Sequence, residues 1–260
     1  MQFVDSHCHL NYKSYRQDVQ EVIQRAVDQG VYRIIVPGLD LESSRKAVEL
    51  AQRYEPVYAA VGVHPHDVDG FTEEQLPRFV ELISFTKVVA VGEIGLDYYH
   101  RQDNQTLQHQ VLKLFLSLAS EFKKPVIFHS RECLHELIQT VTNFNIENNK
   151  STLRGIFHAF EGDLQDANRV TEIGFYLGAG GSVTYQNSVI KHELFSKINL
   201  SHVMLETDAP FLSPQLYRGQ RNEPGYIPLI AEKVAELQQC DIKEVALITT
   251  SNVNTLFNWK

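Results

Sequence analysis

The chain has 260 residues, 43% of them hydrophobic, which is enough to bury the core of one large domain over residues 1–260. Its formal net charge of −8 gives no global attraction for nucleic acid, which argues against an avid, nonspecific DNA-binding protein. A net negative charge is still compatible with a local basic rim around an active site. No apolar run approaches the roughly 20 residues that span a bilayer, so a membrane-spanning class is excluded.

The first residues and the cysteines indicate the compartment. A predicted strand begins almost directly at the N-terminus and leaves no room for a signal peptide, so we expect a cytoplasmic protein. The three cysteines, Cys8, Cys133 and Cys240, are far apart and form no Cys-x-x-Cys pair. This spacing predicts neither a disulfide framework nor a thiolate zinc site.

Short β-rich apolar runs alternate with longer amphipathic segments along the whole chain. The runs predict eight strands, at residues 2–6, 32–37, 57–62, 88–93, 125–129, 154–158, 175–179 and 203–207. The amphipathic segments predict helices at residues 15–29, 42–54, 73–86, 104–122, 132–145, 164–173, 188–197, 226–239 and 241–257. Strands that alternate with helices indicate parallel β-α units, and eight units fit a closed (β/α)8 TIM barrel. A doubly wound open sheet is the competing arrangement.

The first predicted strand leads into His7 and His9. Successive side chains of a strand point to opposite faces, so these two histidines, two residues apart, project on the same side. Such a pair is half of a metal site, and the alternative is that both are ordinary polar residues of a loop.

Other strand ends carry further candidate ligands. In a barrel of this kind the chemistry lies at the carboxyl ends of the strands. Polar residues there converge on one mouth, and four histidines and two carboxylates do so: His7, His9, Glu93, His129, His158 and Asp208. Glu93 ends a run of small and β-branched residues, where an unpaired buried carboxylate would be costly and a bound cation would remove that cost.

Six nitrogen and oxygen ligands exceed what one tetrahedral zinc ion requires, so the set predicts a two-metal centre. Glu93 would bridge the ions, with His7, His9 and Asp208 on one ion and His129 and His158 on the other. Two cations roughly 4 Å apart polarise a phosphoryl oxygen and activate water, so the predicted reaction is hydrolysis with Asp208 as ligand and general base. The ligand types leave Mg, Mn and Zn open.

Taken together, these segments resemble the TatD-like metal-dependent deoxyribonucleases, a branch of the metal-dependent hydrolases related to amidohydrolases. The resemblance covers essentially the whole chain. It rests on these motifs: Val4-Asp5-Ser6-His7-Cys8-His9-Leu10, Gly62-Val63-His64-Pro65-His66, Gly92-Glu93-Ile94-Gly95-Leu96-Asp97-Tyr98, Pro125-Val126-Ile127-Phe128-His129-Ser130-Arg131, His158-Ala159-Phe160-Glu161-Gly162, Leu205-Glu206-Thr207-Asp208-Ala209-Pro210 and Arg221-Asn222-Glu223-Pro224. It implies a TIM-barrel hydrolase with a divalent-metal centre on the same six residues, often active on DNA as an exonuclease.

Further residues are candidates for contact with substrate. The resemblance implies that His64 contacts the scissile phosphate or an active-site water. The forked donors of Arg131, Arg218 and Arg221 suit phosphate oxygens, and Asn222 lies beside the last of them. For the arginines the alternative is a solvated surface position.

The glycine-rich segment and the remaining histidines lie outside this set. Residues 178–181 predict either a phosphate-cradling loop or close backbone packing. His66 is expected to be structural. The remaining histidines are expected at the surface, away from the mouth: His100, His109, His135, His192 and His202.

The predicted function is a phosphodiesterase of the 3′-5′ exonuclease type, with DNA as substrate, two divalent ions as cofactors and no membrane partner. The chain is expected to be a monomer or a weak oligomer. One alternative is a small-molecule amidohydrolase or lactonase on the same barrel, because Glu132 follows the ligand His129 by three residues, as in some deaminases. The other alternative is a non-catalytic metal-binding module.

Overall fold

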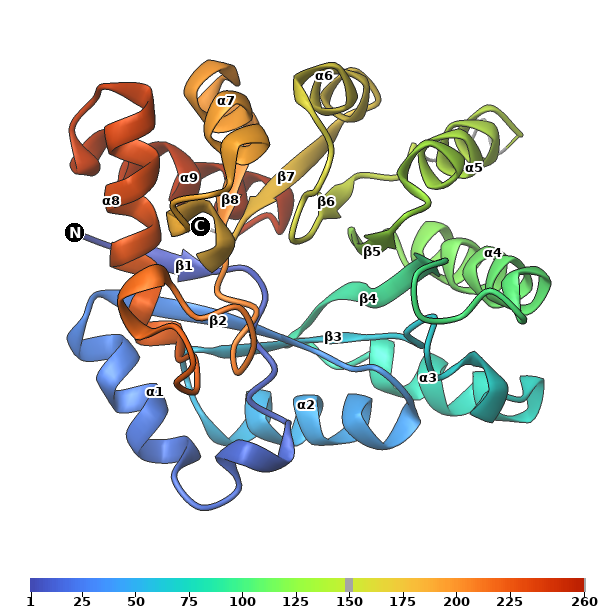
Figure 1. Ribbon diagram of the computed structural model, residues 1–260. Coiled ribbons are helices and arrows are strands. Elements are labelled where there is room, and N and C mark those ends of the chain that lie inside the picture. The colour runs from blue at the N-terminus through green and yellow to red at the C-terminus, as the bar shows by residue number, and fades with distance from the viewer. Residues whose placement is uncertain (148–151, 260) are drawn as a thin grey trace.

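The computed structural model describes residues 1–147 and 152–259. Eight parallel strands form one sheet in the order β1 to β8, and the helices lie around it (Figure 1). The strands are β1 Phe3–Asp5, β2 Val31–Pro37, β3 Val57–Val61, β4 Val88–Asp97, β5 Val126–Arg131, β6 Gly155–Phe157, β7 Phe175–Ala179 and β8 Val203–Leu205. The predicted TIM-barrel class is confirmed.

Each predicted helix has a counterpart in the structure. The helices are α1 Val19–Asp28, α2 Leu41–Arg53, α3 Leu76–Ile83, α4 Gln105–Glu121, α5 Leu134–Glu147, α6 Leu164–Glu172, α7 Val189–Lys197, α8 Ile227–Gln238 and α9 Ile242–Leu256. Local signals set several of their starts. Asp40 and Asp163, for example, accept the backbone N–H three residues further on and so cap α2 and α6.

Within the described ranges, no helix combines the length and apolar character needed to cross a bilayer.

Backbone hydrogen bonds beyond β1 and β8 join the last strand to the first. The Ser6 N–H donates to Leu205 O at 3.0 Å, Asp208 N–H donates to His7 O at 2.9 Å, and His9 N–H donates to Ala209 O at 2.7 Å. These bonds place the segment that carries His7 and His9 directly beside the segment that carries Asp208.

A buried side-chain contact strengthens this junction. Asp5 accepts the Thr207 hydroxyl at 2.5 Å and the backbone N–H groups of Thr207 and His7 at 2.9 and 3.2 Å. Burial raises the pKa of Asp5 well above its usual range, against the lowering effect of these hydrogen bonds. Asp5 thereby ties the ends of β1 and β8 together beneath the two ligand segments.

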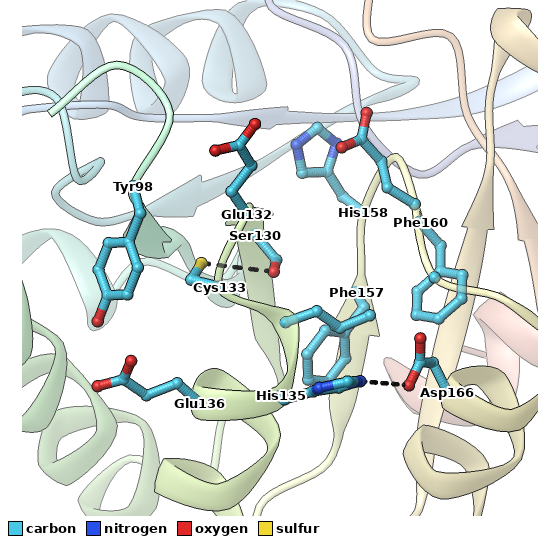
Figure 2. A pocket seen from close by; sticks show the side chains of 13 residues that line it. Tyr98, Ser130, Glu132, Cys133, His135, Glu136, Phe157, His158, Phe160 and Asp166 are labelled. Atoms are coloured by element: carbon cyan, nitrogen blue, oxygen red, sulfur yellow. Dashed lines mark hydrogen bonds and ion pairs between the residues drawn. The ribbon is translucent and has the colours of Figure 1, made fainter. Parts of the chain in front are cut away.

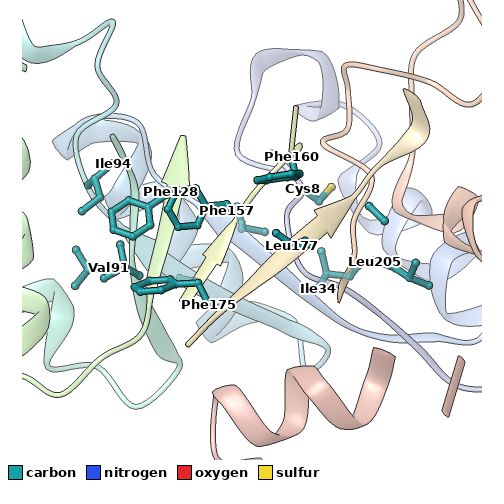
Figure 3. Packing of buried hydrophobic residues seen from close by; sticks show 14 of the residues in the cluster. Cys8, Ile34, Val91, Ile94, Phe128, Phe157, Phe160, Phe175, Leu177 and Leu205 are labelled. Carbon is teal, nitrogen blue, oxygen red and sulfur yellow. The ribbon is translucent and has the colours of Figure 1, made fainter. Parts of the chain in front are cut away.

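Alternate side chains of the strands enter two different cores. One face packs against the helices, and Figure 3 shows Phe128, Phe157 and Phe175 in this layer, with ring centroids 5.0 to 5.6 Å apart. The opposite face fills the barrel with smaller residues, among which are Val4, Ile35, Ala60, Ala90, Ile127, Ile156 and Met204. Because side chains alternate, His129 and His158 point into the barrel two residues after Ile127 and Ile156.

β4 is longer than predicted, and an irregularity in it directs the central carboxylate. The strand continues to Asp97, beyond the predicted end at residue 93. Between the pairs Val91–Val126 and Ile94–Phe128, β4 uses one residue more than β5, which is a β-bulge. A Cβ on Gly92 would lie 2.7 Å from the Ile127 Cβ, so only glycine fits there. After the bulge, Ile94 faces the helices and Glu93 faces the barrel.

We predict that Thr207→Val lowers the free energy of unfolding by about 1–3 kcal/mol, because it removes the hydroxyl that donates to buried Asp5 and leaves the Ala209 N–H without its acceptor. Urea unfolding measures the change. The matched control is Thr255→Val at an exposed position of α9, which should shift the value by less than about 0.5 kcal/mol. Equal effects of the two substitutions would contradict the role given to the Asp5–Thr207 contact.

Candidate metal centre

A cavity of about 560 Å³ opens at the carboxyl ends of the strands. Five of the six predicted ligands line it, and His7 lies fully buried at its floor. The lining ligands are His9, Glu93, His129, His158 and Asp208. The structure therefore brings all six predicted ligands together, and their binding of metal stays a prediction.

Glu93 occupies the middle of this group. Its Oε1 atom lies 2.9 Å from His129 Nδ1, 3.0 Å from His158 Nε2 and 3.5 Å from His64 Nε2. Its Oε2 atom lies 3.2 Å from His7 Nε2 and 3.6 Å from His9 Nε2. The two carboxylate oxygens thus face two different sets of imidazoles, which is the arrangement a bridging ligand needs.

Asp208 completes the set on the side of the first strand. Its Oδ1 atom lies 3.3 Å from His9 Nε2 and 3.7 Å from His7 Nε2. Asp208 adopts the left-handed backbone conformation, with φ of 55°, which costs a non-glycine residue about 1 kcal/mol. The side chain is held in the centre by this turn and by the Asp208 N–H bond to His7 O.

The donor set fits divalent cations. The Nε2 atoms of His7 and His9 face one another at 3.1 Å, and two imidazole nitrogens at that distance share at most one proton. Their Nδ1 atoms are buried without a hydrogen-bond partner among the described residues. A cation between the Nε2 atoms would accept both lone pairs and remove their repulsion. Three triads bring their ligand atoms within 4.8 Å: His7-His9-Asp208, His7-Glu93-His158 and His64-Glu93-His129.

The electrostatics of the centre favour an ionised Glu93. Burial by itself would raise the pKa of this carboxyl, but the surrounding imidazoles of His158, His7 and His64 bring it well below its usual range. Burial lowers the pKa of His64 well below its ordinary value, so that imidazole is neutral. For His158, burial also lowers the pKa, but the carboxylates of Glu93 and Glu206 outweigh it and raise the pKa well above the ordinary value.

Glu206 is a functional residue that the sequence did not single out. Its carboxylate is buried, accepts the backbone N–H of Ala159 and lies 3.6 Å from His158 Nδ1. A carboxylate at that position orients a metal-binding imidazole and raises its basicity. Its place two residues before Asp208, directly after the last strand, was the available signal.

The glycines of residues 178–181 make room for neighbouring groups. A Cβ on Gly178 would lie 2.5 Å from the Glu206 carboxylate, and a Cβ on Gly181 would lie 2.0 Å from Leu212 O. These contacts favour the close-packing interpretation of this segment over a phosphate-cradling loop.

Asp97 is the second residue of the centre that the sequence did not single out. Its contacts change the interpretation of His66 and His100. Its Oδ2 atom lies 3.0 Å from His129 Nε2, so His129 sits between Asp97 and Glu93. The same oxygen lies 2.7 Å from His66 Nε2 and 3.0 Å from His100 Nδ1. The expectation that His100 lies away from the mouth is wrong, because the continuation of β4 to Asp97 carries the following turn back over the cavity.

The predicted substrate contacts divide into two groups. His64 and Arg131 line the cavity, although Arg131 is paired with Glu161. Arg218 lies over the Tyr185 ring at 4.7 Å and is not among the residues that line the cavity.

Arg221 and Asn222 are engaged elsewhere. Arg221 pairs with Asp18 at 2.6 Å and with Glu223 at 2.8 Å. Asn222 is buried, and its amide donates to Thr207 O at 2.8 Å and to Phe211 O at 2.6 Å. The geometry therefore gives these two residues the role of holding the loop after β8, in place of the predicted contact with phosphate.

A neighbouring pocket of about 510 Å³ shares Ser130, His158 and Glu161 with the cavity. Figure 2 shows Tyr98 on one side of this pocket and Phe160 on the other. Its lining includes four acidic side chains, Glu132, Glu136, Glu161 and Asp166, of which Glu161 pairs with Arg131 and Asp166 lies 2.7 Å from His135. Carboxylates repel phosphate groups, so the part of this pocket that Glu132 and Glu136 line suits an uncharged or cationic part of a substrate.

The family model described as TatD related DNase matches residues 4–258. The chain is 38% identical to the uncharacterized metal-dependent hydrolase YabD of Bacillus subtilis, over 97% of this chain and 98% of that protein. It is 32% identical to the uncharacterized metal-dependent hydrolase TatD of Mycobacterium tuberculosis, over 98% and 97%. Among solved structures, YjjV, a TatD homologue from Escherichia coli, matches with a TM-score of 0.91 and 34% identity over 98% of both chains.

We predict that His9→Ala weakens binding of divalent metal at least about 10-fold, because it removes a nitrogen that faces Glu93 and Asp208. Cys8→Ser is the matched control at the neighbouring position. Cys8 packs on the opposite side, with its Sγ 3.8 Å from Ala209 O, so metal binding should be preserved. Metal content after equilibrium dialysis measures both, and equal losses would contradict the assigned directions of the two side chains.

We also predict that Glu206→Gln weakens metal binding about 10- to 100-fold, because the amide keeps the acceptor for Ala159 N–H but removes the charge behind His158. Competition with a chelator gives the affinity. Glu172→Gln at the exposed end of α6 is the control and should leave the affinity unchanged. An unchanged metal affinity of the Glu206→Gln variant would mean that this carboxylate contributes only to packing.

Proposed function

The chain belongs to the TatD related DNase family and is a metal-dependent hydrolase, and from this premise we propose that it is a deoxyribonuclease of the 3′-5′ exonuclease type with two divalent ions. The observation that carries the proposal is the position of Glu93, whose two oxygens face separate imidazole sets. A bridging carboxylate of this kind is typical of paired metal ions that act on phosphate esters.

We assign the ligands as follows. His7, His9 and Asp208 would hold one ion, His129 and His158 would hold the other, and Glu93 would be shared. When bound, such ions polarise a phosphoryl oxygen and lower the pKa of water. All six ligands come from one chain, so the proposal works for a monomer or a weak oligomer. The mixture of imidazoles and carboxylates is compatible with Zn, Mn or Mg.

Asp208 is the proposed general base. Burial would raise the pKa of its carboxyl, but the hydrogen bond from His9 and the nearby imidazoles lower it below the usual value. Asp208 is therefore ionised at neutral pH and can accept the proton of an attacking water. Its side chain lies on the cavity wall, where water and substrate reach it.

His64 is the proposed contact for the scissile phosphate or the attacking water. It lines the cavity, and its Nε2 atom lies 3.5 Å from Glu93 Oε1. Because burial keeps this imidazole neutral, it can donate one hydrogen bond to a phosphate oxygen without adding a charge.

A second candidate function is hydrolysis of a small ester or amide. Glu132 and Glu136 in the lining of the neighbouring pocket favour it, since a long polyanionic strand would meet their carboxylates there. Such a substrate would place its reactive carbonyl at the same metal centre and its uncharged part in that pocket.

We predict that the purified protein releases nucleotides from labelled single-stranded DNA when Mg²⁺ or Mn²⁺ is supplied. Asp208→Ala should lower the rate at least about 100-fold, because it removes both a ligand and the base. Asp28→Ala on the exposed face of α1 is the control and should retain the wild-type rate.

Two outcomes would count against a deoxyribonuclease. Cleavage that persists in Asp208→Ala would point to a contaminating nuclease or another base. Turnover of lactones or amides without cleavage of DNA, in a panel that also includes RNA and small phosphodiesters, would favour the second candidate.

A further inference from the structure

A second group of ligating side chains lies beside the centre described above. His66, Asp97 and His100 bring two imidazole nitrogens and a carboxylate oxygen within 4.8 Å of one another, and all three line the cavity. We propose that these side chains form a third cation site, which binds a divalent ion of the zinc class. The inference goes beyond the proposed hydrolysis and does not depend on the identity of the substrate.

Asp97 has one oxygen bound to backbone N–H groups and one that faces three imidazoles. Its Oδ1 atom accepts the backbone N–H groups of Tyr99 at 3.1 Å and His100 at 2.8 Å. Its Oδ2 atom lies 2.7 Å from His66 Nε2, 3.0 Å from His100 Nδ1 and 3.0 Å from His129 Nε2. The side chain is fully buried, so its partners come from this cluster and the backbone.

Three imidazoles cannot all form hydrogen bonds to one carboxylate oxygen. A carboxylate oxygen offers two lone-pair directions, so only two of the three rings can donate to it with good geometry. If the His129 N–H takes one direction, a cation can take the other and also accept the lone pairs of His66 Nε2 and His100 Nδ1. All the polar atoms around Oδ2 are then satisfied, and His129 keeps its position beside Glu93.

The cluster is open enough to load an ion. The His66 and His100 side chains are 37% and 52% exposed, while Asp97 is buried behind them. Three protein ligands with one side open to the cavity leave a coordination position for water or a substrate atom. The ion would also add positive charge to a mouth where Arg131 is already paired with Glu161.

The ligand types select the metal. Two imidazoles and one carboxylate suit Zn²⁺, whereas Mg²⁺ prefers oxygen ligands and octahedral geometry. Tetrahedral ligands of zinc lie about 3.4 Å apart, which follows from zinc-ligand distances of about 2.1 Å. The distances from Oδ2 to the His66 and His100 nitrogens are 2.7 and 3.0 Å, about 0.7 and 0.4 Å shorter, so the exposed rings would move apart by that much as the ion enters.

The test counts zinc ions per chain by elemental analysis after equilibrium dialysis against a fixed micromolar concentration of free Zn²⁺. The wild-type protein should bind about three ions, and His100→Gln and His66→Gln should each bind about two. Dialysis against Mn²⁺ should give equal metal content in wild type and His100→Gln, because the ligands of the paired centre are unchanged and a site with two exposed imidazoles binds Mn²⁺ more weakly than Zn²⁺. A Co²⁺ titration should show visible absorbance for a third equivalent in the wild type and its loss in His100→Gln.

The matched control is His135→Gln, an exposed histidine that pairs with Asp166 in the neighbouring pocket. It should bind as much zinc as the wild type, which separates the proposed site from general surface histidines. A wild-type protein with two zinc ions, or a His100→Gln variant with the full wild-type content, would overturn the proposal. Failure of the proposed paired centre would appear separately, as low Mn²⁺ content in the wild type.

Discussion

The buried carboxylate of Glu93 is the constraint on which the rest of the centre depends. An isolated ionised carboxylate inside the barrel would cost many kcal/mol in desolvation, so it requires opposite charge or donors on every side. Five imidazoles from the ends of β1, β3, β5 and β6 lie within 3.6 Å of its two oxygens. The bulge in β4 that turns Glu93 inward, and the glycine that permits the bulge, are therefore as important as the ligands themselves.

A second set of buried carboxylates supports the imidazoles from behind. Asp97 lies against His129, and Glu206 lies against His158. Each carboxylate orients a ring toward Glu93 and raises its basicity, which is how proteins usually prepare histidine for metal binding. Asp5 performs a related task for the backbone, since it joins Thr207 to the strand that presents His7. The centre is thus held from behind by buried carboxylates, of which Asp97 also borders the cavity while Asp5 and Glu206 do not.

The charges around the mouth limit the kind of substrate that the cavity can receive. The arginines near the centre are largely neutralised: Arg131 pairs with Glu161, and Arg221 pairs with Asp18 and Glu223. The neighbouring pocket adds the carboxylates of Glu132 and Glu136. For the proposed phosphodiester substrate, attraction for the phosphate group would come mainly from bound cations, and metal loading would be a condition for substrate binding as well as for chemistry.

The sequence by itself determined the barrel and the six candidate ligands. Strand and helix periodicities are local properties, and the rule that parallel strands end on one face brings His7, Glu93 and Asp208 together without knowledge of any contact. Only the tertiary structure decided the choice of partner for polar groups. Arg221 binds Asp18, 203 residues away in the chain, and His100 turns to Asp97 because β4 continues past its predicted end. Hydrogen bonds and ion pairs select among groups that only the closed barrel brings within reach, so no local pattern encodes them.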